Sequence, residues 1–155
     1  VYGWPTEPKF YVPDGVYEHF QQGIGARGAK AEAAWSALFA KYKTEYPELA
    51  AELELMQQRK LPAGWDTTLP TYAADPKGKA TRDVSGEALN AIAKNVPWLI
   101  GGAADLAPST KTLIKGSDGF QAGNYGGRNF HFGIREHAMA AAVNGLTLSR
   151  VRGYG

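Results

Sequence analysis

The chain contains 155 residues, of which 44% are hydrophobic and 21% are charged, and its formal net charge at pH 7 is +2. This composition is typical of a soluble globular protein, with either one domain or the joined parts of two. The charges are interspersed, which argues against a nucleic-acid surface, and no apolar run approaches the roughly 18 residues of a membrane span. The lack of cysteine in the sequence excludes disulfides, thiolate zinc sites and a cysteine nucleophile.

The two ends of the sequence indicate a segment of a longer protein. The N-terminal stretch VYGWPTEPKF has no initiator Met and lacks the basic and apolar regions of a signal peptide. The last residues, VRGYG, contain no terminating element. We expect a soluble, cytoplasmic protein, with an organellar location left open.

Residues 1–60 are predicted to be mainly helical. A first helix is expected from Pro13–Asp14, and the glycines between residues 23 and 28 are expected to interrupt it. The following stretch, rich in Ala, Glu, Lys and Leu, has apolar residues at helical spacing, and Pro47 is expected to begin a second helix. The pattern predicts an amphipathic helical pair with one core face and one solvated face.

Residues 61–79 are predicted to form an extended linker, because three prolines and two glycines interrupt the segment LPAGWDTTLPTYAADPKGK. In residues 80–155, Thr81 is expected to cap a helix that ends at about Asn95, before Pro97. The stretch WLIGGAADL is predicted to be a short buried strand, and NFHFGI a second one after a glycine-rich loop. A helix from REHAMAAAVNGLTL and a strand from VRGYG complete an incomplete parallel α/β sheet.

Two sets of polar residues follow the predicted strands, where ligands of open α/β sheets bind. Asp105 and Ser109 lie after the first strand, where hydroxyl and backbone N–H groups could contact an anion. Glu136 begins the helix after the second strand, beside several small alanines. Arg82 lies in the first turn of its helix, where a cation is slightly unfavourable for the helix dipole and could instead serve an anion.

Each of these residues also has an ordinary structural interpretation. Asp105 and Ser109 could cap a helix or turn, and Glu136 could simply complement the helix dipole. Arg82 could be a surface residue without a ligand. The three histidines have no metal-ligand spacing, so no metal site is expected within the chain.

The two strand-end motifs, GGAADLAPS and GIREHAM, occur here in the order found in transketolases. The stretch from ATRDVSGEALN to AAAVNGLTL resembles the start of the transketolase pyrimidine-binding domain. The preceding FYVPDGVYEHF, the helical region and LPAGWDTTLPTY resemble the connection from the family's diphosphate-binding domain. The resemblance implies that residues 1–60 end the diphosphate domain and connector, 61–79 form a linker, and 80–155 begin a truncated pyrimidine-binding domain.

The resemblance also implies roles for the candidate residues. Glu136 matches the glutamate that hydrogen-bonds the aminopyrimidine ring of thiamine diphosphate and shares a proton with a ring nitrogen, which makes it the expected catalytic and cofactor-binding residue. Asp105 matches an acidic residue near the cofactor. Arg82 and Ser109 match residues that hold the phosphate of the sugar substrate. The resemblance implies no role for His131 or His137.

The implied activity is that of the pentose phosphate pathway enzyme: reversible transfer of a two-carbon ketol unit from a ketose phosphate to an aldose phosphate. Family members are homodimers with shared active sites, and the divalent metal, Mg or Ca, is bound by residues outside this chain. The 155-residue chain alone is therefore expected to be inactive. Neither a nucleic acid nor a membrane is an expected partner.

Two other functional classes remain open at this point. One is another thiamine-diphosphate enzyme, such as dihydroxyacetone synthase or deoxyxylulose-phosphate synthase, which would share the role of Glu136. The other is a non-catalytic assembly module that keeps the fold alone. The joint presence of Arg82, Ser109 and Glu136 favours the transketolase interpretation over both.

Overall fold

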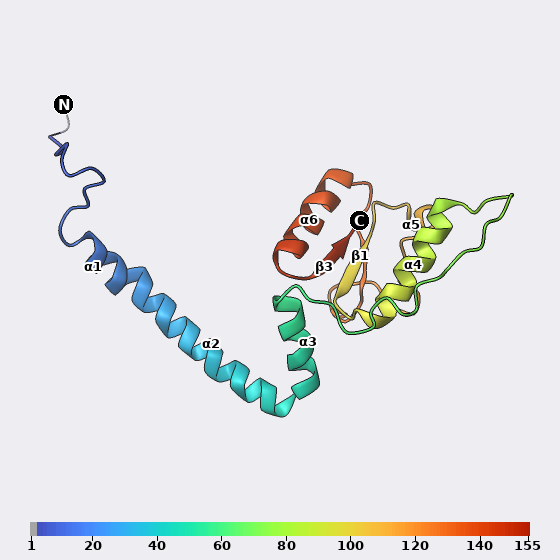
Figure 1. Cartoon of the computed structure of the whole chain (residues 1–155), viewed down its shortest axis with the longest axis horizontal. Helices are drawn as coiled ribbons and strands as arrows, with labels where there is room; N and C mark the ends of the chain where they lie inside the picture. The colour runs from blue at the N-terminus through green and yellow to red at the C-terminus, as the bar shows by residue number, and fades with distance from the viewer. Residues whose placement is uncertain (1–2) are drawn as a thin grey trace. The chain divides into compact units, whose positions relative to one another are not determined.

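Residues 3–155 are described by a computed structural model of the chain (Figure 1). They form two compact units, which are separated in the sequence between Ala51 and Glu52. The first unit is helical, and the second contains helices and a small parallel sheet. The predicted class, α/β with a helical region before an incomplete parallel sheet, is confirmed.

The first unit contains a long, continuous helical run. α1 (Val16–Phe20), the π-helix η1 (Gln21–Gly25) and α2 (Ala26–Glu45) follow one another without a break. The expected interruption by glycines was wrong, because the backbone remains helical at Gly25, with φ −63° and ψ −50°. The glycine-rich part instead forms a wider π-helical segment, a form seen mainly as short insertions within α-helices.

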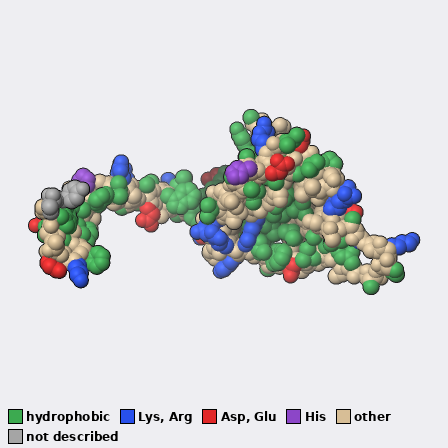
Figure 2. All heavy atoms as spheres, turned by 90° about the horizontal axis from the view of Figure 1, so that it is seen from above, with side chains coloured by type: hydrophobic (Ala, Val, Ile, Leu, Met, Phe, Trp, Pro, Cys, Tyr) green, Lys and Arg blue, Asp and Glu red, His purple; other side chains and the backbone are tan. Residues whose placement is uncertain are grey.

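The predicted apolar face of α2 is exposed to solvent in the described part of the chain. The rings of Trp35 and Phe39 stack with their centroids 5.7 Å apart, and Tyr42 continues this aromatic row. Trp35 is nevertheless 56% exposed, and no residue of α2 is buried. Figure 2 shows hydrophobic side chains on the surface of the first unit. The helix was predicted correctly, but residues 3–155 do not cover its apolar face.

α3 (Pro47–Gln57) begins at the proline that the sequence pattern indicated. Proline is favoured in the first turn of a helix because the N–H group that it lacks would have no intrahelical partner there. The preceding helix ends at Tyr46, whose backbone N–H donates to the Tyr42 carbonyl oxygen at 2.7 Å.

The second unit has a three-stranded sheet in the order β2–β1–β3, and both strand pairs are parallel. The central strand, β1 (Leu99–Ala103), pairs with β2 (Asn129–His131) and with β3 (Arg152–Tyr154). Consecutive parallel strands need a crossover, and α6 (Glu136–Leu148) connects β2 to β3. In Figure 1, α6 and α4 (Thr81–Asn95) flank the sheet.

The N-cap of α4 lies one residue before the position predicted from the sequence. Ala80 is the N-cap, with extended backbone angles, and no side chain caps the helix; Thr81 is the first helical residue. The helix ends at Asn95, before Pro97, as predicted. Arg128 donates from one guanidinium nitrogen to the Ala93 carbonyl oxygen at 2.9 Å, which satisfies part of the C-terminal end of α4.

The small core of the second unit lies where α4, β1 and the loop before β2 meet. The buried hydrophobic residues of this unit are Ala93, Val96, Ala103, Ala104 and Ile114. Asn129 is the buried polar residue beside them: it accepts from the Ile114 N–H at 2.8 Å and donates to the Ile114 and Ser117 carbonyl oxygens at 3.0 and 2.7 Å. A buried amide with all these partners fixes the loop that leads into β2.

Residues 61–79 contain no helix or strand, as expected of an extended segment. The segment follows α4 closely. Thr68 Oγ1 donates to the Ala91 carbonyl oxygen at 3.3 Å, and Asn95 Nδ2 donates to the Trp65 carbonyl oxygen at 3.2 Å. The Thr68 side chain and the Trp65 backbone therefore attach this segment to the helix that carries Arg82.

Candidate functional site

The carboxyl end of β1 turns sharply into α5 (Ala107–Thr110), and Asp105 lies at this turn. Its φ is +67°, a left-handed conformation that Asp adopts more readily than most residues. The side chain is exposed, and α5 has no side-chain cap, so the capping interpretation of Asp105 is wrong. Its carboxylate has no recorded partner among residues 3–155.

Ser109 lies inside α5 and is exposed. The backbone N–H groups of Ser109 and Thr110 both donate to the Leu106 carbonyl oxygen at 2.9 Å, so the expected contribution of these N–H groups to anion binding is not supported. The Thr110 hydroxyl also donates to Leu106, at 3.0 Å. The Ser109 hydroxyl makes no hydrogen bond within the described part of the chain and is available to a ligand.

Arg82 is exposed in the first turn of α4. Its guanidinium group forms no ion pair or hydrogen bond with any residue between 3 and 155. α4 packs against α5, because Gly86, one turn after Arg82, meets the backbone of Lys111 at the end of α5. The packing therefore brings the helix start with Arg82 and the short helix with Ser109 to the same end of the unit.

Glu136 is the first residue of α6 and is exposed. The turn before it is held by Arg135, which donates from its guanidinium group to the Phe132 carbonyl oxygen at 3.0 Å, and by Gly133 at φ +66°. Arg135 therefore has a structural hydrogen bond. The carboxylate of Glu136 has no partner among the described residues, and His137 is exposed beside it.

The parallel sheet explains why these residues lie at one edge. Ala103 at the end of β1 is in register with His131 at the end of β2, and the Phe132 N–H donates to the Ala103 carbonyl oxygen at 3.4 Å. Asp105 comes two residues after the end of β1 and Glu136 five residues after the end of β2, at the edge where ligands of parallel sheets bind. The topology thus groups the predicted site residues, while their roles remain predictions.

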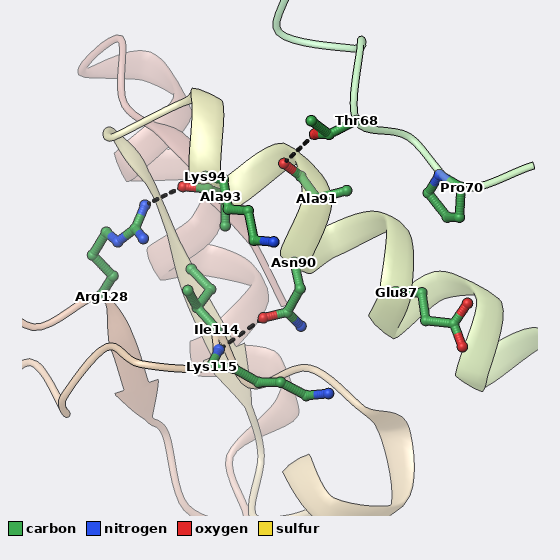
Figure 3. A pocket seen from close by; sticks show the side chains of 10 residues that line it. All are labelled: Thr68, Pro70, Glu87, Asn90, Ala91, Ala93, Lys94, Ile114, Lys115 and Arg128. Atoms are coloured by element: carbon green, nitrogen blue, oxygen red, sulfur yellow. Dashed lines mark hydrogen bonds between the residues drawn. The ribbon is translucent and has the colours of Figure 1, made fainter.

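The sequence interpretation did not single out Glu87 and Asn90, two polar residues of α4 that make hydrogen bonds to other segments. Both residues line a cavity of ≈ 390 Å³ along α4 (Figure 3). In this view Asn90 points from α4 toward the backbone of Lys115, and its Oδ1 accepts from that N–H at 2.8 Å. The sequence did show that Asn90 lies two helical turns after Arg82. An asparagine within a helix is not distinctive enough by itself to indicate a functional role.

No group of three His, Cys, Asp or Glu side chains that could hold a metal ion occurs in residues 3–155. No helix in this described range is long and apolar enough to cross a membrane.

Comparisons with known proteins agree along nearly the whole chain. The sequence model of the family described as "Transketolase, pyrimidine binding domain" matches residues 77–153, and that of "Transketolase, thiamine diphosphate binding domain" matches residues 1–62. The transketolase of Bacillus subtilis is 51% identical over 150 residues, and that of Geobacillus stearothermophilus is 52% identical over 148. Each of these alignments covers 96% of the chain but only 22% of the relative.

Solved structures give the same result. The transketolase of Pichia stipitis, 41% identical, superposes with a TM-score of 0.82 over 94% of this chain and 22% of that one. The transketolase of Leishmania mexicana, 36% identical, superposes with a TM-score of 0.76 over 90% and 21%.

The fold and the matched domains define the class of protein as one built on thiamine-diphosphate-binding domains. Within this class the chain belongs to the transketolase family. It spans about a fifth of the length of the curated relatives that it matches.

Proposed function

We propose that the chain acts as part of a full-length transketolase, which reversibly transfers a two-carbon ketol unit from a ketose phosphate to an aldose phosphate. The observation that carries this proposal is the grouping of Arg82, Ser109, Asp105 and Glu136, all exposed, at one end of the parallel-sheet unit. The transketolase of Pichia stipitis, which this chain resembles, has been solved in complexes with sedoheptulose 7-phosphate and fructose 6-phosphate. These complexes support sugar phosphates as the substrate class.

The residues present fit the aminopyrimidine part of thiamine diphosphate. Glu136 has an exposed carboxylate without a recorded partner among residues 3–155, and a carboxylate is the acceptor that an aminopyrimidine N–H needs. The rings of Phe130 and Phe132 stack at the end of β2, before Glu136, with their centroids 5.4 Å apart. When bound, the cofactor supplies the carbon nucleophile of ketol transfer. Glu136 would share one proton with a ring nitrogen: its carboxylic acid form donates to that nitrogen, and its carboxylate form accepts from the protonated ring.

Arg82 and Ser109 supply the contacts for the substrate phosphate. A guanidinium group binds phosphate through paired charge-assisted hydrogen bonds, and the Ser109 hydroxyl adds a neutral donor. Asp105 follows the end of β1, and its proposed contact is a hydrogen bond to the cofactor.

The remaining parts of the proposal concern the whole enzyme. The divalent metal, Mg or Ca, would be held outside residues 3–155, which offer no group of three suitable side chains. We also propose a homodimer with shared active sites in the pentose phosphate pathway, and a cytoplasmic location. The matched ranges 1–62 and 77–153 support the division into a diphosphate-domain and connector part (1–60), a linker (61–79) and the start of the pyrimidine-binding domain (80–155).

Substrate profiling tests the proposal. The full-length enzyme is the complete polypeptide carrying this chain, or a chimera in which the chain replaces the matching residues of the Bacillus subtilis transketolase. We expect ketol transfer from xylulose 5-phosphate to aldose phosphates. We also expect Arg82→Ala and Ser109→Ala to raise the KM for glyceraldehyde 3-phosphate by about 10- to 100-fold, since a hydrogen bond to a charged group contributes about 1.5–3 kcal/mol.

Unphosphorylated glyceraldehyde is the matched control substrate, and its KM should change little in both variants. Activity confined to formaldehyde or pyruvate as the partner substrate would instead favour dihydroxyacetone synthase or deoxyxylulose-phosphate synthase. Robust ketol transfer by the isolated 155-residue chain would contradict the proposal that the rest of the enzyme is needed.

A further inference from the structure

One face of α4 joins the proposed phosphate site to the packing of the unit. Arg82, Gly86 and Asn90 follow one another at intervals of four residues in this helix. Residues at this spacing lie above one another on the same helical face. Arg82 is exposed at the start of the row, whereas Gly86 is buried and Asn90 is half-buried further along.

Gly86 allows an unusually close approach between α4 and the end of α5. A Cβ atom placed at Gly86 would lie 2.7 Å from the Lys111 Cβ and 2.8 Å from the Lys111 carbonyl oxygen. Both contacts are shorter than real Cβ contacts, and one partner is backbone, so a larger residue at position 86 must push the two helices apart. Lys111 itself has φ +60°, a conformation that a non-glycine residue keeps only where its surroundings hold it.

Asn90 fastens the segment that follows α5 to the same face. Its Nδ2 donates to the Leu113 carbonyl oxygen at 3.0 Å and to the Gly86 carbonyl oxygen of its own helix at 2.8 Å. Its Oδ1 accepts from the Lys115 N–H at 2.8 Å. The amide therefore bonds to the backbone on both sides of Ile114 and holds residues 113–115 against α4. Figure 3 shows the bond to Lys115.

These contacts hold the residues that directly follow Ser109 in the chain. α5 contains Ser109, Lys111 closes α5 against Gly86, and the next residues are held by Asn90. The backbone that carries the Ser109 hydroxyl is thus tied to the helix that carries Arg82. A displacement of about 1 Å between two groups that bind the same ligand can cost up to about a hundredfold in rate.

We infer that Gly86 and Asn90 are positioning residues for the substrate phosphate: they set the separation between Arg82 and Ser109 by holding α5 and residues 113–115 against α4. The inference rests on the proposed function, because Arg82 and Ser109 must first be the phosphate contacts. Neither Gly86 nor Asn90 touches the sugar phosphate in this account. Gly86 acts through the contact of α4 with Lys111 at the end of α5, and Asn90 acts through its hydrogen bonds to residues 113–115.

Steady-state kinetics of the full-length enzyme distinguish a role in positioning the phosphate contacts from a role in general packing. Gly86→Ala and Asn90→Ala are assayed with glyceraldehyde 3-phosphate and with unphosphorylated glyceraldehyde, at a saturating concentration of the ketose phosphate donor. The matched control is Ser85→Ala, an exposed neighbour on α4. Alanine favours helix formation more than glycine does, so a defect of Gly86→Ala cannot come from a weaker helix.

The inference predicts a KM for glyceraldehyde 3-phosphate raised about tenfold in both variants, with kcat and the KM for glyceraldehyde changed less than about twofold. Ser85→Ala should match the unmodified enzyme. An equal loss with both aldehydes, including loss through misfolding, would reduce Gly86 and Asn90 to packing residues and overturn the inference. Unchanged kinetics would overturn it as well.

The Arg82→Ala and Ser109→Ala variants distinguish failure of the inference from failure of the proposed function. If they act selectively on the phosphorylated aldehyde and the Gly86 and Asn90 variants do not, the inference alone fails. If Arg82→Ala and Ser109→Ala show no selectivity, the phosphate site itself is wrongly assigned, and the inference falls with it.

Discussion

Glu87 shows how a single side chain connects the segment before α4 to the helix. Its carboxylate accepts from Tyr72 Oη at 2.6 Å and from Lys79 Nζ at 2.6 and 2.8 Å. The Lys79 ammonium group also lies 4.5 Å from the centre of the Tyr72 ring. The hydrogen bond from Lys79 lowers the pKa of Glu87, and the hydrogen bond to Glu87 raises the pKa of Tyr72 to about 12.

The lowered pKa of Glu87 predicts a pH dependence of stability. The folded state binds this proton more weakly than the unfolded chain, so the contribution of Glu87 is complete above its ordinary value of 4.5 and is lost as pH falls through the lower folded value. Glu87→Gln should therefore lower the Tm at pH 7, with a difference from the unmodified enzyme that shrinks below pH 4.5.

Thermal unfolding of the full-length enzyme at several pH values measures this difference. Asp66→Asn is the control, since it removes an exposed carboxylate that has no recorded partner among residues 3–155. A Tm difference for Glu87→Gln that grew as the pH fell would contradict the assigned hydrogen bonds. Because the pair is half-exposed, high salt should also reduce the difference.

At the scale of elements, the turn between β2 and α6 sets the position of Glu136 at the start of α6. Gly133 occupies a left-handed conformation with φ +66°, and a Cβ there would contact the Arg135 guanidinium group that holds the turn. Gly133→Ala should lower the stability by about 1–2 kcal/mol, the usual penalty for an L-residue in this conformation. It should also reduce turnover, because the turn positions Glu136.

Gly145→Ala is a matched control within α6. A Cβ at Gly145 meets no atom within 4 Å, and the residue is helical, so alanine there should be neutral or stabilising by up to about 1 kcal/mol. Tm and kcat of the two variants of the full-length enzyme test the comparison. Equal Tm values for Gly133→Ala and Gly145→Ala would show that the turn carries no conformational penalty.

Much of the second unit could be predicted because its elements are short apolar runs between clear breakers. Pro97 ends α4 and a glycine-rich loop precedes β2, so the strands and their parallel order followed from periodicity and connection length. This order alone placed Asp105 and Glu136 at one edge of the sheet. The cap of α4 was misplaced by one residue because Ala80, which has no capping side chain, occupies the N-cap.

Other features depend on contacts between distant residues, which periodicity does not contain. Asn90 forms hydrogen bonds with residues more than twenty positions away. The need for glycine at position 86 comes from the close approach of Lys111. The exposure of Trp35 on α2 was not foreseen either, since a periodic apolar face predicts burial without indicating what covers it. Glycines in the first helix were interpreted as breakers, although a helical glycine costs only about 1 kcal/mol.

At the scale of the whole molecule, the chain matches only part of the length of its relatives. The Bacillus subtilis transketolase is 51% identical to this chain, yet the alignment covers only 22% of its length. The sheet of the second unit has three strands, fewer than most sheets contain. We therefore propose the activity for the complete enzyme, with Glu136 as the pyrimidine-side carboxylate and with Arg82 and Ser109 as the phosphate contacts.

The central claim is that Glu136 is the proton-handling carboxylate of a thiamine-diphosphate site. Its most direct test is the kcat of the full-length Glu136→Gln enzyme, measured with saturating thiamine diphosphate and substrates. His137→Ala serves as the neighbouring control. General acid–base assistance contributes roughly 10²–10⁴ in rate, so kcat should fall by that factor in Glu136→Gln and stay near normal in His137→Ala. Unchanged turnover in Glu136→Gln would contradict the assignment and favour a non-catalytic module.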